Sequence, residues 1–230
     1  MRKFRADYFA GGVAPDALRL FAGADKLSTH FYDDQSPATW HTVLDTIMAC
    51  HPEVADGRSV GDATRAWMAG YLAHIAGDIA YWQHVLPLLP PFPERAEAHH
   101  GAWLIADDMA IPDSDRHLDP GSVNYASAPP WVQSAAVQRM LARLQDRILV
   151  DGMWAVEVAY FKARPEAAGR SDAELLAEHL PAWRSRLAEA KDLIPSAAWD
   201  AFRADAVERG ASLVRAYLTG RPAAVHPARL

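Results

Sequence analysis

A histidine and an aspartate lie four residues apart in the middle of the chain, at His74 and Asp78. On an α-helix this spacing places the imidazole and the carboxylate on one face, about 6 Å apart. Side chains so placed can hold one divalent cation, and zinc accepts both ligand types. Their neighbours Tyr71, Ile75 and Trp82 are largely apolar, and a carboxylate buried among them is costly unless it is paired or binds a metal. The pair predicts either a metal site or a buried hydrogen bond between the two side chains.

A further histidine, His84, follows His74 by ten residues on the same predicted helix. Ten residues correspond to about 15 Å along a straight helix, so His84 cannot share an ion with His74. His84 could bind a second metal that Asp78 bridges, but only if the helix bends or frays before it.

A second group of candidate ligands, Asp16 and His30, lies near the N-terminus. Asp16 follows Pro15, and His30 stands in the run Ser28-Thr29-His30-Phe31-Tyr32-Asp33. We expect Asp16 near the start of a helix, where a carboxylate caps free backbone amides as readily as it binds a cation. His30 between a threonine and two aromatic residues equally fits a partly buried histidine without a ligand role.

Together the two groups resemble the zinc-dependent phospholipase C family, which includes secreted bacterial enzymes and is related to the P1-type nucleases. That family carries an aspartate and, fourteen residues later, a histidine in a Ser-His-Phe-Tyr-Asp context, as Asp16 and His30 are spaced here. It then carries a His-x3-Asp-x5-His run, which His74, Asp78 and His84 match. The Gly-x-x-x-Pro-Asp before the first motif is similar to shorter, leaderless bacterial relatives. The matches lie within residues 8–84, about a third of the chain.

The resemblance implies an all-α fold and a cluster of up to three zinc ions that hydrolyses a phosphodiester. Carried over residue by residue, it implies that His30, His74 and Asp78 hold one zinc ion. Asp78 would also bridge to a second ion ligated by His84. Asp16 would ligate a third ion and orient or deprotonate the attacking water. Such ions lower the pKa of bound water and stabilise the charge of the transition state.

The chain departs from the family at the remaining ligands. Secreted members use a free N-terminal tryptophan amine and a nearby histidine for the third zinc, whereas this chain begins Met1-Arg2-Lys3 and has no histidine before His30. The family's His-x3-Glu pair after the long helix is also missing. The nearest substitutes are His99 and His100, which could equally have no ligand role. We therefore expect between one and three metal ions and count His100 among the candidate ligands.

Helical spacing of apolar residues predicts the elements that must position these side chains. The pattern indicates an all-α fold in a single domain over residues 1–230, a bundle of about seven helices of the phospholipase C and P1 nuclease type. No segment shows clear strand alternation. Proline-rich residues 112–130 are expected to form a long loop. The predicted helices begin after Pro15, cover residues 38–50, 62–86, 94–112 and 131–162, open at the capping box Ser171-Asp172-Ala173-Glu174, and run from Pro195 to about Gly220.

Composition and charge exclude several classes of protein. Half of the 230 residues are hydrophobic and 23% are charged, which excludes a disordered or collagen-like chain. The formal net charge of −6 argues against a nucleic-acid partner. Asp7 interrupts any apolar run at the N-terminus, and no stretch is long and apolar enough to span a bilayer. We expect a cytoplasmic protein with no transmembrane segment; the sequence leaves its oligomeric state open.

Three functions fit these observations. The first is a zinc-dependent, phospholipase-C-like hydrolase of a phosphoester, with a small soluble molecule among its possible substrates. The second keeps the metal and changes the chemistry to another step of small-molecule metabolism, with iron in place of zinc, since histidine and carboxylate also suit iron. The third is a helical module without catalytic activity. Elemental analysis would separate the first two functions, and the absence of bound metal would favour the third.

Overall fold

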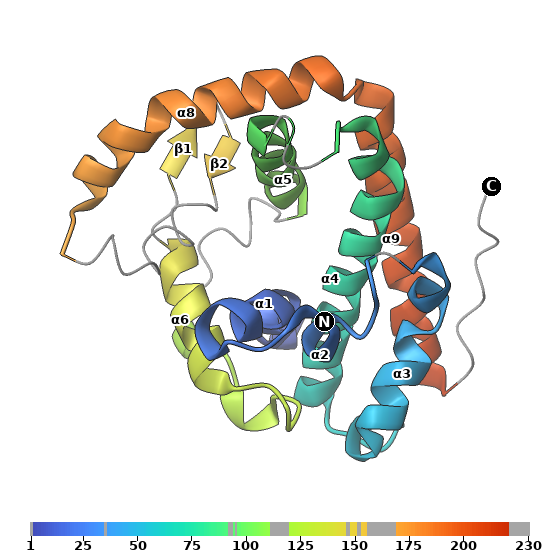
Figure 1. Ribbon diagram of the computed structural model, residues 1–230. Coiled ribbons are helices and arrows are strands. Elements are labelled where there is room, and N and C mark those ends of the chain that lie inside the picture. The colour runs from blue at the N-terminus through green and yellow to red at the C-terminus, as the bar shows by residue number, and fades with distance from the viewer. Residues whose placement is uncertain are drawn as a thin grey trace. The chain divides into compact units, whose positions relative to one another are not determined.

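The computed structural model describes residues 2–34, 36–91, 94, 96–110, 120–145, 148–150, 153–155 and 169–220. Most of these residues are helical (Figure 1), which confirms the predicted helical class. The α-helices are α1 (Arg5–Ala22), α2 (Lys26–His30), α3 (Val43–Cys50), α4 (Asp62–His84), α5 (Ala96–Ala110), α6 (Ser134–Gln145), α8 (Asp172–Leu193) and α9 (Ser196–Thr219). Short 3-10 helices lie at Arg2–Phe4, Pro37–His41, Pro52–Val54, Leu86–Leu88, Pro120–Ser122 and Tyr125–Ser127. The resemblance to the phospholipase C type of fold stays a prediction.

The chain divides into two compact units. The first comprises Met1–Ile79, Asp119–Leu141 and Asp205–Leu230, and the second comprises Ala80–Leu118 and Ala142–Ala204. Helices α4, α6 and α9 contribute residues to both units. The single domain expected over residues 1–230 stays a prediction.

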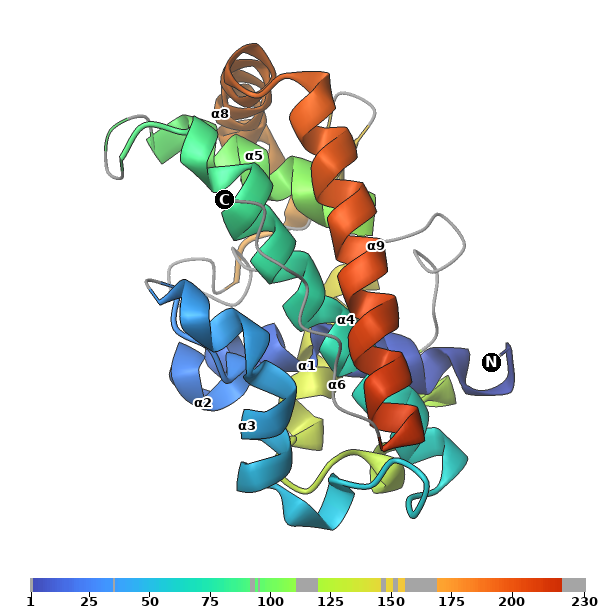
Figure 2. The same ribbon diagram turned by 90° about the vertical axis from the view of Figure 1, so that its right-hand side faces the viewer.

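In the first unit, glycines allow α1 and α4 to approach each other closely. A Cβ atom on Gly11 would collide with the carbonyl oxygen of Trp67, and one on Gly70 would collide with that of Tyr8. The two backbones can therefore touch only because both positions lack a side chain. On another side of α4 lies α9 (Figures 1 and 2), where a Cβ on Gly210 would lie 3.7 Å from the Cα of Ala73.

The start of α1 differs from the prediction. The helix begins at Arg5 and includes Pro15, so Asp16 lies well inside it and not near its start. The buried face recurs at helical spacing from Ala6 through Ala10 and Ala14 to Leu18. Pro15 removes one backbone hydrogen bond of this helix. Its apolar ring is buried, and the packing of α1 on α4 outweighs the local preference of glycine and proline for a helix end.

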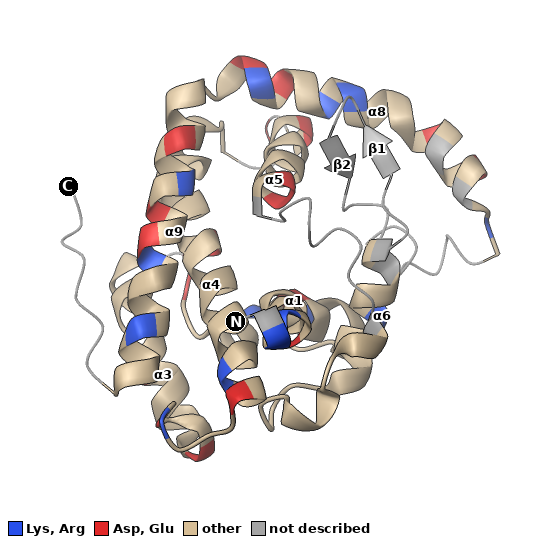
Figure 3. Cartoon of the chain, turned by 180° about the vertical axis from the view of Figure 1, so that it is seen from behind, with Lys and Arg blue, Asp and Glu red and all other residues tan. Residues whose placement is uncertain are grey.

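The second unit is built around α5 and α8, which also approach each other at a glycine. A Cβ on Gly101 would collide with the carbonyl oxygen of Arg186, and the Arg186 guanidinium pairs with Glu97 at 2.5 Å. The predicted capping box at the start of α8 is confirmed, with Glu174 and Ser171 bonding each other's backbone amides. Along α8 and α9, basic and acidic side chains are interspersed (Figure 3).

The helix predicted over residues 131–162 is wrong at residues 148–150 and 153–155, and residues 156–162 lie outside the described part of the chain. Two short antiparallel strands follow, β1 (Ile148–Val150) and β2 (Met153–Ala155), with Leu149 paired to Trp154. In the sequence they are separated by Asp151-Gly152, a dipeptide typical of two-residue hairpin turns. The alanine-rich flanks suggested a continuous helix and obscured this turn signal.

The other boundaries follow the prediction closely. Helices α4, α5 and α9 lie within a few residues of their predicted limits, and the segment 38–50 divides into a 3-10 helix and α3. Of the expected loop at 112–130, residues 120–130 contain two 3-10 turns, and residues 112–119 lie outside the described part of the chain. No described helix combines the length and the apolar character that crossing a membrane requires.

Candidate metal centre

The crossing of α1 and α4 brings Asp16 to the His74–Asp78 face. Asp16 lies five residues beyond Gly11 on α1, and His74 lies four residues beyond Gly70 on α4. Both side chains are thus within about 8 Å of the glycine contacts along their helix axes. The aspartate carboxylate consequently faces the imidazole of His74, with Oδ2 lying 3.9 Å from Nε2.

The short helix α2 supplies His30. The chain leaves α1 through Gly23, whose φ of 70° requires a left-handed conformation that glycine adopts readily. Asp25 then caps α2 by accepting a hydrogen bond from the Ser28 amide at 2.8 Å. After His30, Phe31 also takes a left-handed conformation, with φ of 59°, which is uncommon for a residue with a side chain. Through this turn both His30 and Tyr32 contact Asp78 on α4.

Four side chains meet at this place, two imidazoles between two carboxylates. The Nε2 atoms of His30 and His74 are 3.4 Å apart. The Nε2 of His30 lies 3.7 Å from Asp16 Oδ1 and 3.3 Å from Asp78 Oδ2. The Nε2 of His74 lies 3.8 Å from Asp78 Oδ1. Asp16, His30 and His74 each offer one donor atom within 4.8 Å of the others, and Asp78 contacts both imidazoles from outside that set of three.

These separations suit a shared cation better than direct hydrogen bonds. Four ligands at about 2.1 Å from a zinc ion in a tetrahedron lie about 3.4 Å from one another. Hydrogen bonds between imidazole and carboxylate are shorter, at 2.7–3.2 Å. The three contacts among Asp16, His30 and His74 range from 3.4 to 3.9 Å, and Asp78 lies outside this set of three. The donor set and its spacing therefore fit a divalent metal ion.

Burial and charge at the centre differ between its two kinds of ligand. The His30 side chain is fully buried, whereas those of Asp16 and Asp78 are 27% and 31% exposed. Burial by itself raises the pKa of the Asp78 carboxyl, but the neighbouring His74 and His30 outweigh it and lower the pKa below its ordinary value. Asp78 is thus held as a carboxylate, the form that binds a cation.

Tyr32 orients Asp78 from the other side. Its hydroxyl donates a hydrogen bond of 3.0 Å to Oδ2 of Asp78, the same oxygen that faces His30. Burial and the nearby Asp78 carboxylate raise the pKa of the Tyr32 phenol, so it keeps its proton and remains a donor. Hydrogen bonds of this kind from outside the ligand set orient metal-binding carboxylates in proteins.

Thr29 determines which ring nitrogen of His30 carries the proton. The Thr29 hydroxyl lies 2.8 Å from Nδ1 of His30 and 3.1 and 3.2 Å from the carbonyl oxygens of Asp25 and Lys26. Carbonyls only accept hydrogen bonds, so the single hydroxyl proton goes to one of them and the oxygen accepts from Nδ1–H. The lone pair of Nε2 then faces the two carboxylates and His74, as metal binding requires.

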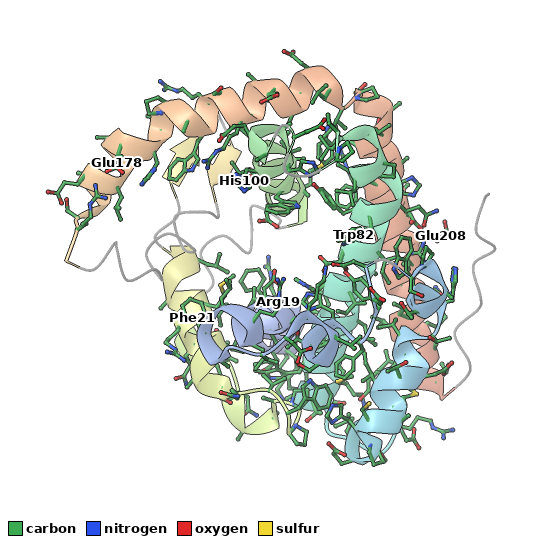
Figure 4. All side chains as sticks on the ribbon, viewed as in Figure 1. Arg19, Phe21, Trp82, His100, Glu178 and Glu208 are labelled. Carbon is green, nitrogen blue, oxygen red and sulfur yellow. The ribbon has the colours of Figure 1, made fainter. Side chains whose placement is uncertain are left out.

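The remaining predicted ligands do not join this group. His84 is the last residue of α4 and falls in the second unit, as does His100 on α5 (Figure 4). His99 donates a hydrogen bond of 2.7 Å from Nε2 to the carbonyl oxygen of Pro90. His100 packs against Trp103. Within the described ranges, no group of three potential ligands includes these three histidines. Glu157, a carboxylate with the apolar neighbours Val156 and Val158 in the sequence, lies outside the described residues.

The residues that support the ligands could not be predicted from the sequence. Thr29 and Tyr32 flank His30, and Arg19 has its Nη1 atom 3.5 Å from Asp16 Oδ1. No spacing rule marks such residues, because their partners lie on other elements. The one local signal for Arg19 was its separation of three residues from Asp16, which places both side chains on one helix face.

No protein-family model, curated protein or solved structure matches this chain. The resemblance to the phospholipase C family therefore rests on the two spaced motifs alone.

Proposed function

We propose that this protein is a metal-dependent hydrolase of phosphoesters that binds zinc through Asp16, His30 and His74, with Asp78 as a further ligand. The observation that carries the proposal is the set of contacts of 3.3–3.9 Å among these four side chains. Phosphoester chemistry is supported by the resemblance of the Asp16–His30 and His74–Asp78–His84 spacing to the phospholipase C family.

The proposed ligands and their neighbours have distinct roles. When bound, zinc lowers the pKa of a water molecule and withdraws electron density from phosphoryl oxygens. His30 and His74 hold the ion through Nε2, and Thr29 and Tyr32 keep their ligands oriented. Asp16, which is partly exposed, orients the attacking water and accepts its proton. The resemblance implies that Asp16 ligates a separate third ion. The contacts of Asp16 with His30 and His74 favour a role for it at the same ion as these histidines.

Metal content and hydrolysis test the proposal together. The purified protein, treated with chelator and then titrated with zinc, should bind at least one ion per chain with a dissociation constant in the micromolar range or below. The zinc-loaded protein should hydrolyse bis(4-nitrophenyl) phosphate, and chelator should abolish the activity. Asp16→Asn should lower turnover, whereas Asp45→Asn on the exposed face of α3 should not. Absence of zinc binding would overturn the proposal, and zinc binding without hydrolysis would leave only a metal-binding module.

A second candidate function uses iron. The three residues whose donor atoms all approach one another are two histidines and one carboxylate, the ligand set of many non-haem iron enzymes. Elemental analysis of protein purified without added metal distinguishes the candidates. One iron per chain, together with no phosphoester hydrolysis after exchange to zinc, would favour iron chemistry.

A further inference from the structure

Arg19 places a positive charge beside the candidate metal centre. It lies on α1 one turn beyond Asp16 (Figure 4), and its Nη1 is 3.5 Å from Oδ1 of that aspartate. The same Oδ1 atom lies 3.7 Å from Nε2 of His30. A single carboxylate oxygen therefore separates the guanidinium from the donor atoms of the centre.

The guanidinium of Arg19 is free to bind another anion. Its side chain is 43% exposed, and its 3.5 Å contact with Asp16 is at the outer limit of a hydrogen bond. Exposed pairs of this kind are weak, so the guanidinium can turn from the aspartate to a ligand with little loss. Arginine also presents a planar fork of N–H donors that matches two oxygens of a phosphoryl group.

The other nearby cation, Lys26, is already engaged. Its Nζ lies 2.6 Å from Oδ1 of Asp34, and it stacks 5.2 Å from the centre of the Tyr32 ring. Lys26 therefore neutralises Asp34 and steadies the tyrosine that bonds Asp78. Of these two cations, Arg19 is the one that can pair with a substrate.

The charges of the centre leave a place for an anionic ligand beside Arg19. One divalent cation neutralises Asp16 and Asp78, the imidazoles are neutral when they bind metal, and Lys26 cancels Asp34. Arg19 then leaves one net positive charge. We propose that Arg19 binds the non-bridging oxygens of the substrate phosphate; this rests on the proposed function.

Calorimetric titration of the zinc-loaded protein with inorganic phosphate tests the role of Arg19. Arg19→Gln should weaken phosphate binding at least about tenfold without changing zinc content, because a charge-assisted pair of hydrogen bonds is lost. Arg19→Lys should recover part of the affinity, since it keeps the charge but not the fork. The matched control is Arg203→Gln, because Arg203 is an exposed arginine on α9 that also pairs with an aspartate three residues earlier, at 3.8 Å. It should bind phosphate like the wild type.

Steady-state kinetics gives a second test of Arg19. Arg19→Gln should raise the KM for bis(4-nitrophenyl) phosphate more than it lowers kcat, because Arg19 binds the substrate phosphate. A variant with an unchanged KM would overturn the role of Arg19.

Other outcomes overturn the role of Arg19 or the function itself. Equal phosphate affinity of Arg19→Gln and wild type would overturn the role of Arg19 and leave the metal centre standing. Loss of zinc from Arg19→Gln would make it a residue that positions Asp16, and equal loss of phosphate affinity in Arg203→Gln would indicate a general charge effect; both overturn the inference. A wild type that binds no zinc would overturn the proposed function as well.

Discussion

Histidines occur in pairs in both units of this chain, and the surroundings of the two pairs are unlike. In the first unit, His30 and His74 come from different helices and direct their Nε2 atoms to one another between two carboxylates. In the second unit, His99 and His100 are neighbours on α5. His99 bonds the carbonyl of Pro90, and His100 packs against an indole ring.

The comparison shows what separates a potential ligand from a structural histidine. Adjacent residues on one helix point about 100° apart around its axis, so they cannot converge on one ion. Residues from separate helices can converge, provided the backbones approach closely and carboxylates supply compensating charge. Convergence of elements, more than the number of histidines, distinguishes the first pair.

Removal of a ligand should produce the largest difference between the two pairs. His74→Ala deletes one donor of the proposed centre and should weaken zinc binding by more than about 100-fold, beyond the effect usual for supporting residues. His100→Ala should leave zinc affinity unchanged. Competition titration with a fluorescent chelator measures both. Equal affinities of the two variants would remove the distinction between the pairs.

Alanine in place of a glycine at the two helix contacts should lower stability in both units but weaken metal binding in the first unit alone. Gly70→Ala would push α4 away from Tyr8 on α1, and Gly101→Ala would push α5 away from Arg186 on α8. Each should lower the free energy of unfolding by about 1–3 kcal/mol or more, as overpacking does. Only Gly70→Ala should also weaken zinc binding by the folded protein, because it separates Asp16 from His74. Chemical denaturation and zinc titration check the two effects.

Gly77→Ala is the matched control on α4. A Cβ at Gly77 meets no atom within 4 Å, so alanine should stabilise the protein by about 0.5–1 kcal/mol through its better helix propensity. Destabilisation by Gly77→Ala would show that any change in α4 is harmful and that the crossing has no special part.

Loss of the hydroxyl that supports His30 should have a moderate effect. Thr29→Val keeps the size of the side chain but leaves Nδ1 of His30 without its partner at 2.8 Å. We expect zinc affinity to fall by about 10- to 100-fold, the range for such supporting residues. Thr46→Val on α3 also removes a threonine hydroxyl that bonds a backbone carbonyl, at 3.0 Å, and should not alter zinc affinity. Similar losses in both variants would refute a specific role for Thr29.

Removal of the helix caps should give the smallest difference in zinc affinity between the two units. Asp25→Ala removes the cap of α2 and should weaken zinc binding less than Thr29→Val does, because His30 is five residues further along. Ser171→Ala removes the cap of α8 in the second unit and should cost about 1 kcal/mol of stability with no change in zinc affinity. Thermal unfolding and zinc titration of both variants test this contrast. Weaker zinc binding in Ser171→Ala than in Asp25→Ala would contradict the prediction.

The cap of α2 also predicts a pH dependence. The hydrogen bond from the Ser28 amide lowers the pKa of the Asp25 carboxyl below its ordinary value of 3.8. The carboxylate therefore stabilises the folded state above that ordinary value, and the stabilisation is lost as the pH falls through the lowered one. The difference in stability between wild type and Asp25→Ala should accordingly shrink in strong acid. A difference that grows on acidification would contradict this assignment.

Several elements follow from sequence because their signals are local. The capping box at Ser171 and Glu174 marks the start of α8, and apolar periodicity marks α4. Two segments differ from the prediction, the first because packing outweighs a local signal and the second because a local signal was missed. Gly11, Gly12 and Pro15 resemble helix breakers, yet they lie inside α1 because glycine permits contact with α4. The Asp151-Gly152 turn signal was overlooked within an alanine-rich region.

The sequence by itself determined that His74 and Asp78 share a helix face, because four residues make about one turn. Only the tertiary structure decided that Asp16 and His30 meet that face, and that Thr29 and Tyr32 support the ligands from behind. The reason is physical. Distances within a helix depend on backbone geometry alone, whereas distances between α1, α2 and α4 depend on where glycines let backbones touch and where the chain turns at Gly23.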